Sequence, residues 1–148
     1  MRQIIYAMHF KGQASAKADN SSVIRATTTA TSCIVRTTVG AQGVEGTFQA
    51  AEGDLAFFES EVQLTGPDSF SEKGTITFGD NHLLRFSSLQ NGYIGPGGGP
   101  DIRLGAVSWK VEGGEGQFAD AMGTITSNFT LSETGEVNDY HFGVIFVP

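Results

Sequence analysis

The sequence has almost nothing that could cross-link the chain or anchor it in a membrane. Cys33 is the only cysteine, so no disulfide can form within the chain and nothing demands an oxidising compartment. No run approaches the ~18 apolar residues of a membrane-spanning helix. The opening residues are too interrupted by polar side chains to act as a secretory signal. We therefore expect a cytoplasmic protein without a membrane partner.

Basic residues are also scarce. Lys and Arg number 9 against 16 Asp and Glu, which gives a net charge of −7. Such a chain repels phosphate backbones, so we expect no nucleic-acid partner. The overall charge does not exclude an acidic metabolite, because a local arginine could still hold one.

Helical periodicity is missing as well, and no internal repeat is present. Residues that favour extended backbone are frequent instead, and turn residues separate the alternating segments. We predict strands at residues 3–10, 23–39 (one bent strand, or two broken near 29–32), 43–52, 54–64, 72–78, 82–89, 102–111, 124–131 and 136–147, with a loop or weak strand at 11–22 and a rim loop at 95–100.

These eight or nine strands are evenly spaced over a single domain, residues 1–148, and predict an all-β barrel. The clearest local feature is the glycine-rich stretch at residues 113–123. Glycine adopts positive φ freely and lets two backbones approach closely. We expect a corner between two strands here, with Phe118 and Ala121 plugging one end of the barrel.

Two stretches resemble the allene oxide cyclase barrel, a fold that the plant dirigent proteins share. Gly113-Gly-Glu-Gly-Gln-Phe-Ala-Asp-Ala-Met-Gly123 is similar to the Gly-Gly-x-Gly-x-Phe-x-x-Ala-x-Gly corner of that superfamily. Thr77-Phe-Gly-Asp-Asn-His-Leu-Leu84 resembles its Phe-Gly-Asp-x-Gly-x-Ile turn. The closing strand looks more like related bacterial barrels of unknown function. The resemblance implies an eight-stranded antiparallel barrel of the allene oxide cyclase type, in a family whose members are often oligomeric.

The resemblance does not extend to the residues that catalyse the cyclase reaction. Plant allene oxide cyclases rearrange a fatty-acid epoxide in an apolar barrel, with a carboxylate and an Asn on the first strand. When Tyr6 is aligned with the tyrosine of that strand, those positions become Ala7 and His9. In the second motif, His82 replaces a glycine. The comparison therefore implies the barrel without its activity.

Four polar side chains stand beside apolar ones on the predicted strands and could orient an oily ligand. Histidine can also act as a general acid or base near neutrality. Ordinary barrel packing, in which each polar tip finds one partner, explains the pattern equally well. The candidate catalytic residues are Tyr6, His9, His82 and Tyr140, and the candidate substrate-binding residues are Phe58, Phe78, Phe86, Arg103, Trp109, Phe129 and Phe142.

Two further pairs of residues leave alternatives open. Glu59 and Glu61 share one face of their strand, where they are either a lumenal general base or, as we favour, part of a solvated outer face. Arg103 and Trp109 share one face of the predicted strand at residues 102–111. They form either an anion clamp with an aromatic wall or part of the outer surface. Cys33 has no nearby His in sequence, which favours a buried thiol over a nucleophile.

We expect no metal and no cofactor. The three histidines lie on separate predicted strands without paired spacing, which is a weak metal signal. Residues 114–119 fit Gly-x-Gly-x-x-Ala, but a strand follows them where a dinucleotide site needs a helix.

Three functions stay open. The favoured one is a cofactor-independent isomerase, cyclase or lyase acting on a hydrophobic metabolite in the lumen. The others are a non-catalytic barrel that binds a hydrophobic ligand, and a filled barrel that acts only through its surface. Residues 136–147 are apolar on both faces, so we also expect a homo-oligomer, either a dimer or a trimer.

Overall fold

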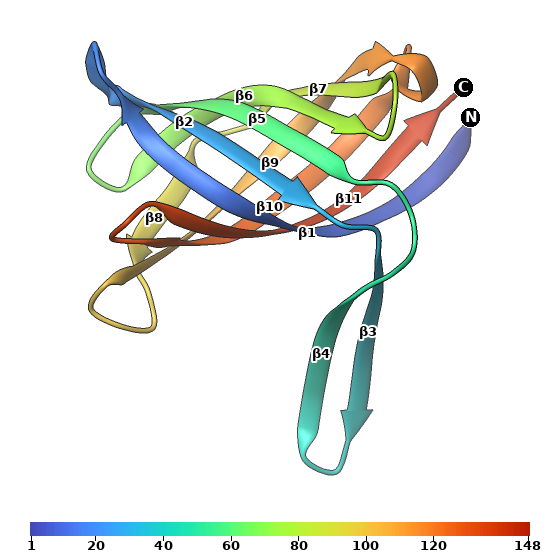
Figure 1. Ribbon diagram of the computed structural model, residues 1–148, viewed down its shortest axis with the longest axis horizontal. Coiled ribbons are helices and arrows are strands. Elements are labelled where there is room, and N and C mark those ends of the chain that lie inside the picture. The colour runs from blue at the N-terminus through green and yellow to red at the C-terminus, as the bar shows by residue number, and fades with distance from the viewer.

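A computed structural model describes residues 1–148 as an all-β protein (Figure 1). It has no helix that is long and apolar enough to cross a membrane. Its elements are β1 (Arg2–Lys17), β2 (Asn20–Ala30), β3 (Cys33–Gly40), β4 (Gly43–Ala50), β5 (Ala56–Leu64), β6 (Ser69–Phe78), β7 (His82–Ser88), β8 (Gly92–Pro96), β9 (Ile102–Glu115), the 3-10 turn η1 (Gly116–Phe118), β10 (Met122–Ser132) and β11 (Glu136–Val147).

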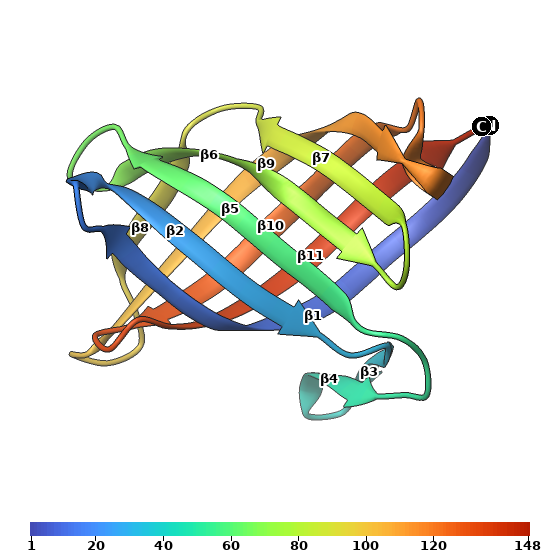
Figure 2. The ribbon, with the colours of Figure 1, turned by 45° about the horizontal axis from the view of Figure 1, so that its top comes forward.

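Eight of these strands close into an antiparallel barrel, which confirms the predicted fold class (Figure 2). Around the barrel the order is β1, β2, β5, β6, β7, β9, β10 and β11, and β11 pairs with β1 over its whole length. The short strand β8 lies outside this ring and bridges β6 and β9. Both chain termini lie side by side at one end of the barrel.

Two strand predictions need correction. The first strand does not end near residue 10, because β1 continues to Lys17 and pairs with β2, so that the segment predicted as a loop or weak strand is mostly strand. Gly12 permits this crossing, since a β-carbon there would stand 2.1 Å from the Thr27 carbonyl oxygen. The predicted loop at residues 95–100 begins inside β8, which ends at Pro96 and pairs mainly with β9. The predicted break near residues 29–32 is confirmed, between β2 and β3.

The hairpin of β3 and β4 pairs only with itself and projects from the barrel wall (Figure 1). We call it the arm. Its side chains are exposed except for Cys33 and Phe48, which are half-buried. Phe48 packs on the outside of the barrel, against His9 and Tyr140.

The alternation of buried and exposed residues identifies the lumen. On β5, Ala56, Phe58 and Ser60 are buried, and the residues between them are not. These buried residues therefore form the lumenal face of β5. Glu59 and Glu61 consequently lie on the outer face, as the favoured interpretation predicted.

The glycine-rich corner is present where the sequence predicts it. β9 runs through the first glycines to Glu115, and η1 then turns Phe118 into the barrel end, where it is 3% exposed. Gly116 has a φ of +62° and lies so close to the Asn81 carbonyl that no β-carbon would fit. The Phe118 ring packs on Phe78 with centroids 5.2 Å apart, so this end of the lumen is closed.

Candidate functional site

Aromatic rings fill the middle of the lumen. Phe86 stacks on Trp109 with ring centroids 4.1 Å apart, and Phe58 lies 5.5 Å from Phe86. On the other side, Phe10 stacks on the buried His141 at 4.4 Å. Together with the Phe118 plug, this layer of packed rings occupies the half of the lumen nearest the termini.

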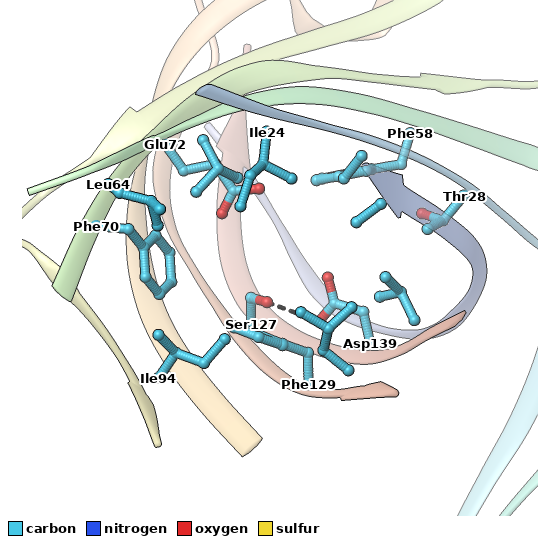
Figure 3. Close-up of a pocket in the computed structure, with 15 residues that line it drawn as sticks. Ile24, Thr28, Phe58, Leu64, Phe70, Glu72, Ile94, Ser127, Phe129 and Asp139 are labelled. Atoms are coloured by element: carbon cyan, nitrogen blue, oxygen red, sulfur yellow. Dashed lines mark hydrogen bonds between the residues drawn. The ribbon is translucent and has the colours of Figure 1, made fainter. Parts of the chain in front are cut away.

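The opposite half contains a cavity of about 70 Å³ (Figure 3). Its walls are apolar, and the strand ends near the rim, such as Leu64, contribute partly exposed side chains. Four polar side chains face the cavity among these walls, namely Thr28, Glu72, Ser127 and Asp139. All four are buried. We call them the polar floor.

Glu72 on β6 is the first carboxyl group of the polar floor. Trp109 Nε1 donates to its Oε1 at 3.2 Å, and Ser60 Oγ lies 2.6 Å from its Oε2. Burial raises the pKa of Glu72 to about 8, and the negative charge of Asp139 adds to this rise against the opposing hydrogen bonds. Glu72 is therefore predominantly protonated at neutral pH.

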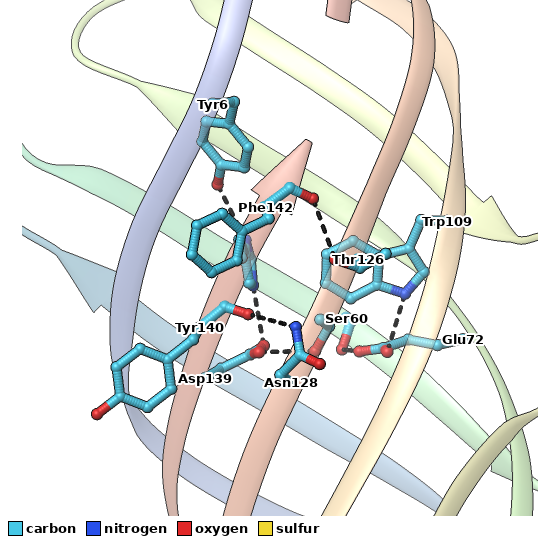
Figure 4. Close-up of polar contacts among 11 residues, drawn as sticks. Tyr6, Ser60, Glu72, Trp109, Thr126, Asn128, Asp139, Tyr140 and Phe142 are labelled. Carbon is cyan, nitrogen blue, oxygen red and sulfur yellow. Dashed lines mark hydrogen bonds and ion pairs between the residues drawn. The ribbon is translucent and has the colours of Figure 1, made fainter. Parts of the chain in front are cut away.

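Asp139 on β11 is the second carboxyl group, and it has a different environment (Figure 4). Ser127 Oγ donates to its Oδ1 at 2.6 Å, and His141 Nε2 lies 2.9 Å from its Oδ2. Tyr6 Oη completes the series 2.9 Å from His141 Nδ1. In the tautomer that also gives the Tyr6 proton an acceptor, Tyr6 O–H donates to His141 Nδ1, and His141 Nε2–H donates to Asp139. The pKa of Tyr6 is raised by burial and by the charge of Asp139, which keeps its proton in place.

Thr28 is the exception in an otherwise satisfied interior. Its Oγ1 is the only buried side-chain nitrogen or oxygen atom without a hydrogen-bond partner, and the residue is 2% exposed. Because it faces the cavity, a ligand or water there could supply the missing partner. A buried, unpaired hydroxyl costs about 1–3 kcal/mol, so the position favours an occupied cavity.

The structure places six of the predicted site residues in the lumen, but only some of them near the cavity. Phe58 and Phe129 line it, and Trp109 donates a hydrogen bond to Glu72 of the polar floor. Tyr6 is connected to Asp139 of that floor only through His141. Phe78 and Phe86 belong to the filled half and pack on other aromatic rings.

Three other predicted residues lie on the outer face of the barrel and are corrections. On β1 the even-numbered Tyr6 and Phe10 are buried, so His9 points outward and stacks on Tyr140 with centroids 4.2 Å apart. On β11 the buried positions are odd-numbered, which places Tyr140 and Phe142 outside (Figure 4).

His82 and Arg103 are also corrected. His82 begins β7 and is exposed, and its Nδ1 accepts a hydrogen bond from the Gln117 backbone N–H at 3.0 Å. Arg103 is exposed near the start of β9 and does not line the cavity, although Trp109 further along that strand is fully buried. The lumenal anion clamp therefore does not form.

Sequence reasoning missed Glu72 and Asp139 entirely. A signal was available, because each is an acid on the apolar face of its strand. Glu72 alternates with the buried Phe70, and Asp139 lies between Val137 and His141 on the buried face of β11. An acid at such a position must be protonated or hydrogen-bonded, and both conditions occur here.

No three His, Cys, Asp or Glu side chains come together in a way that could hold a metal ion. No family model, curated protein or solved structure matches the chain. The resemblance to the allene oxide cyclase superfamily stays a prediction.

Proposed function

We propose that the protein is a cofactor-independent isomerase that moves a proton within a small, uncharged molecule bound in the cavity. The observation that carries this proposal is the pair of carboxyl groups on the polar floor. Burial keeps Glu72 protonated, and Asp139 carries the negative charge that raises the pKa of its neighbour. An acid and a base that coexist at one pH are what a proton-transfer reaction requires.

The cavity narrows the predicted hydrophobic metabolite to a small, neutral one. No Lys or Arg lines it, and Asp139 would repel an anion. A single water needs about 10–15 Å³ by this measure, so 70 Å³ accommodates a handful of non-hydrogen atoms. A small ketone fits this description, as does the end of a longer molecule that reaches in from the rim.

The proposed step balances with the chain's own groups. With a β,γ-unsaturated ketone, Asp139 takes a proton from the carbon between the carbonyl and the double bond, while Glu72 gives its proton to the carbonyl oxygen, which produces a dienol. Return of the proton from Asp139 to the γ-carbon, and of the oxygen's proton to Glu72, completes a shift of the double bond into conjugation. Thr28, which has no other partner, is placed to orient the substrate.

One observation favours a non-catalytic binding protein as the second candidate. Both oxygens of Glu72 already have partners in Ser60 and Trp109. Its proton can therefore satisfy Ser60 instead of reaching a substrate. In that case the cavity would bind the same class of molecule without changing it. A filled barrel is less well supported, because the cavity remains.

The predicted homo-oligomer and cytoplasmic location are proposals too. The outer side chains of β11 support the oligomer, since Phe142, Val144 and Phe146 are exposed in a single chain.

The test is NMR of small cyclic enones and ketones mixed with the protein in D₂O. We expect deuterium to enter beside the carbonyl, and the β,γ-unsaturated enone to convert to its conjugated isomer. Asp139→Asn should slow both about 100- to 10,000-fold, as loss of a general base does. Glu59→Gln is the matched control, because it removes a carboxyl from the outer face of β5 and should keep the wild-type rate.

Binding without exchange, equal in the wild type and Asp139→Asn, would establish the second candidate and refute the catalytic one. If no compound shifts the resonances of the cavity residues, both fail.

A further inference from the structure

One part of the barrel exterior carries no charge, although Lys11, Lys110, Glu112 and Glu136 border it. We call it the neutral wall: the outward residues Gln3, Ile5 and Ala7 of β1, Met122, Thr124, Thr126 and Asn128 of β10, and Asn138, Tyr140, Phe142, Val144 and Phe146 of β11. The outer groove over β5, β6 and β7, in contrast, is lined by Arg25, Glu59, Glu61, Lys73 and Arg85. In a chain with 25 charged residues, that difference marks the neutral wall as a distinct surface.

The neutral wall also exposes a continuous apolar patch. Ile5 is opposite Val144 in the β1–β11 pairing, and Met122 is opposite Phe146 in the β10–β11 pairing. Ile5 is 74% exposed and Met122 54%, and Phe142 beside them is 47% exposed. Contiguous exposed apolar side chains of this kind mark interaction sites.

The arm has an apolar face and a polar face. Paired residues of a hairpin share one face, so Val35 with Phe48 and Val39 with Val44 lie on the same side. Arg36 and the pair of Thr38 with Glu45 lie on the other. Phe48 packs on Tyr140 and Phe142, with centroids 5.3 and 6.1 Å away, so the apolar face of the arm meets the neutral wall at its base.

This apolar face continues past the barrel with nothing to cover it. Val39 is 84% exposed and Val44 is 69% exposed at the tip of the arm. A lone two-stranded hairpin is marginally stable in water and needs packing on one face. Its own barrel supplies that packing only near Phe48.

We propose that two copies of this chain associate about a two-fold axis, with the arm of each lying on the neutral wall of the other. Both surfaces belong to every copy, as an isologous contact requires. Each copy has a net charge of −7, so close approach is easiest through an uncharged surface. The twelve residues of the neutral wall and the eight paired residues on the apolar face of the arm together reach the lower end of the roughly 20–30 residues per side of a standard stable interface.

Light scattering of the full chain at micromolar concentration tests the association. The wild type should have twice the monomer mass of 15.7 kDa. Val144→Glu on the neutral wall and Val39→Lys on the arm should each halve that mass, because each buries an unpaired charge. Thr75→Lys on the charged side is the control and should stay dimeric. Backbone NMR spectra confirm that each variant is folded.

A mixing experiment tests which surfaces meet. Val39→Lys and Val144→Glu, each monomeric alone, should form a heterodimer when combined, since the lysine on one arm then faces the glutamate on the other wall. A monomeric or trimeric wild type, or dimers that survive both substitutions, would overturn the proposal. Two folded monomers that fail to combine would do so too.

Discussion

The two ends of the lumen differ in how side chains fill them. Near the termini, Phe118 plugs the end and aromatic rings fill the interior. At the other end the strands enclose a cavity whose buried polar groups include an unpaired hydroxyl, Thr28, and a protonated acid, Glu72. The filled end gains stability from burial. The hollow end buries less apolar surface and is less stabilised, which is typical of binding and catalytic sites.

The largest expected effect is at the filled end. Phe118→Ala should lower the free energy of unfolding by about 3–5 kcal/mol, because it removes a buried ring and leaves a void. Urea denaturation measures this loss. Phe129→Ala, at the hollow end, should lose less, because that ring is partly exposed beside existing empty space. Equal losses of unfolding free energy in Phe118→Ala and Phe129→Ala would contradict the difference between the filled and the hollow end.

The second effect depends on pH. The pKa of Glu72 rises from its ordinary 4.5 to about 8 on folding, so the folded protein binds more protons between these values. Its contribution to stability is fully present below pH 4.5 and is lost as pH rises towards 8, by at most about 1.4 kcal/mol per pH unit. Glu72→Gln keeps the shape of the neutral acid and should flatten this slope in thermal denaturation. A slope unchanged by the substitution would contradict the raised pKa.

Two tyrosines on adjacent strands provide the next comparison. Tyr6→Phe removes the partner of His141 Nδ1 inside the barrel and should cost about 1–3 kcal/mol. Tyr140→Phe, on the outer face, should change stability by less than about 0.5 kcal/mol. Chemical denaturation of both variants measures the difference. A larger effect from Tyr140 would place the polar network outside the lumen.

The smallest effect should be a gain. Thr28→Val replaces the unpaired hydroxyl with a methyl group and should stabilise the free protein by about 1 kcal/mol. The same change should weaken binding of a small ketone, as measured by NMR titration. Thr27→Val, exposed on the outer face of β2, should alter neither. Loss of stability in Thr28→Val would mean that its hydroxyl has a partner in solution.

The fold was largely predictable from the sequence, and the site was not. Strand patterns and the glycine-rich corner identify a barrel with Phe118 as its plug, and both are confirmed. They work because alternation and turn residues are local signals. β8 was missed, and the second half of β1 was predicted only as a loop or weak strand, since Pro96 and small residues weaken those signals.

To predict the site, one must know which face of each strand points into the lumen. Tyr140 and Phe142 were placed in the lumen because aromatic residues alternate on one face of their strand, but that face is the outer one. His9 was proposed because histidine can act as an acid or base near neutrality, and it lies on the face of β1 opposite the buried Tyr6 and Phe10. Glu72 and Asp139 lie on different strands, and only barrel closure brings them to one cavity. No local sequence pattern shows that Glu72 and Asp139 line the same cavity.

The most direct test of the central claim is a pH titration of the Glu72 side-chain carboxyl by carbon NMR. Its resonance is assigned by its absence from the spectrum of Glu72→Gln. We expect a midpoint at about pH 8, so that Glu72 is protonated at neutral pH. A midpoint near the ordinary value of 4.5 would mean that both carboxyl groups are ionised, and the acid–base pair would not exist.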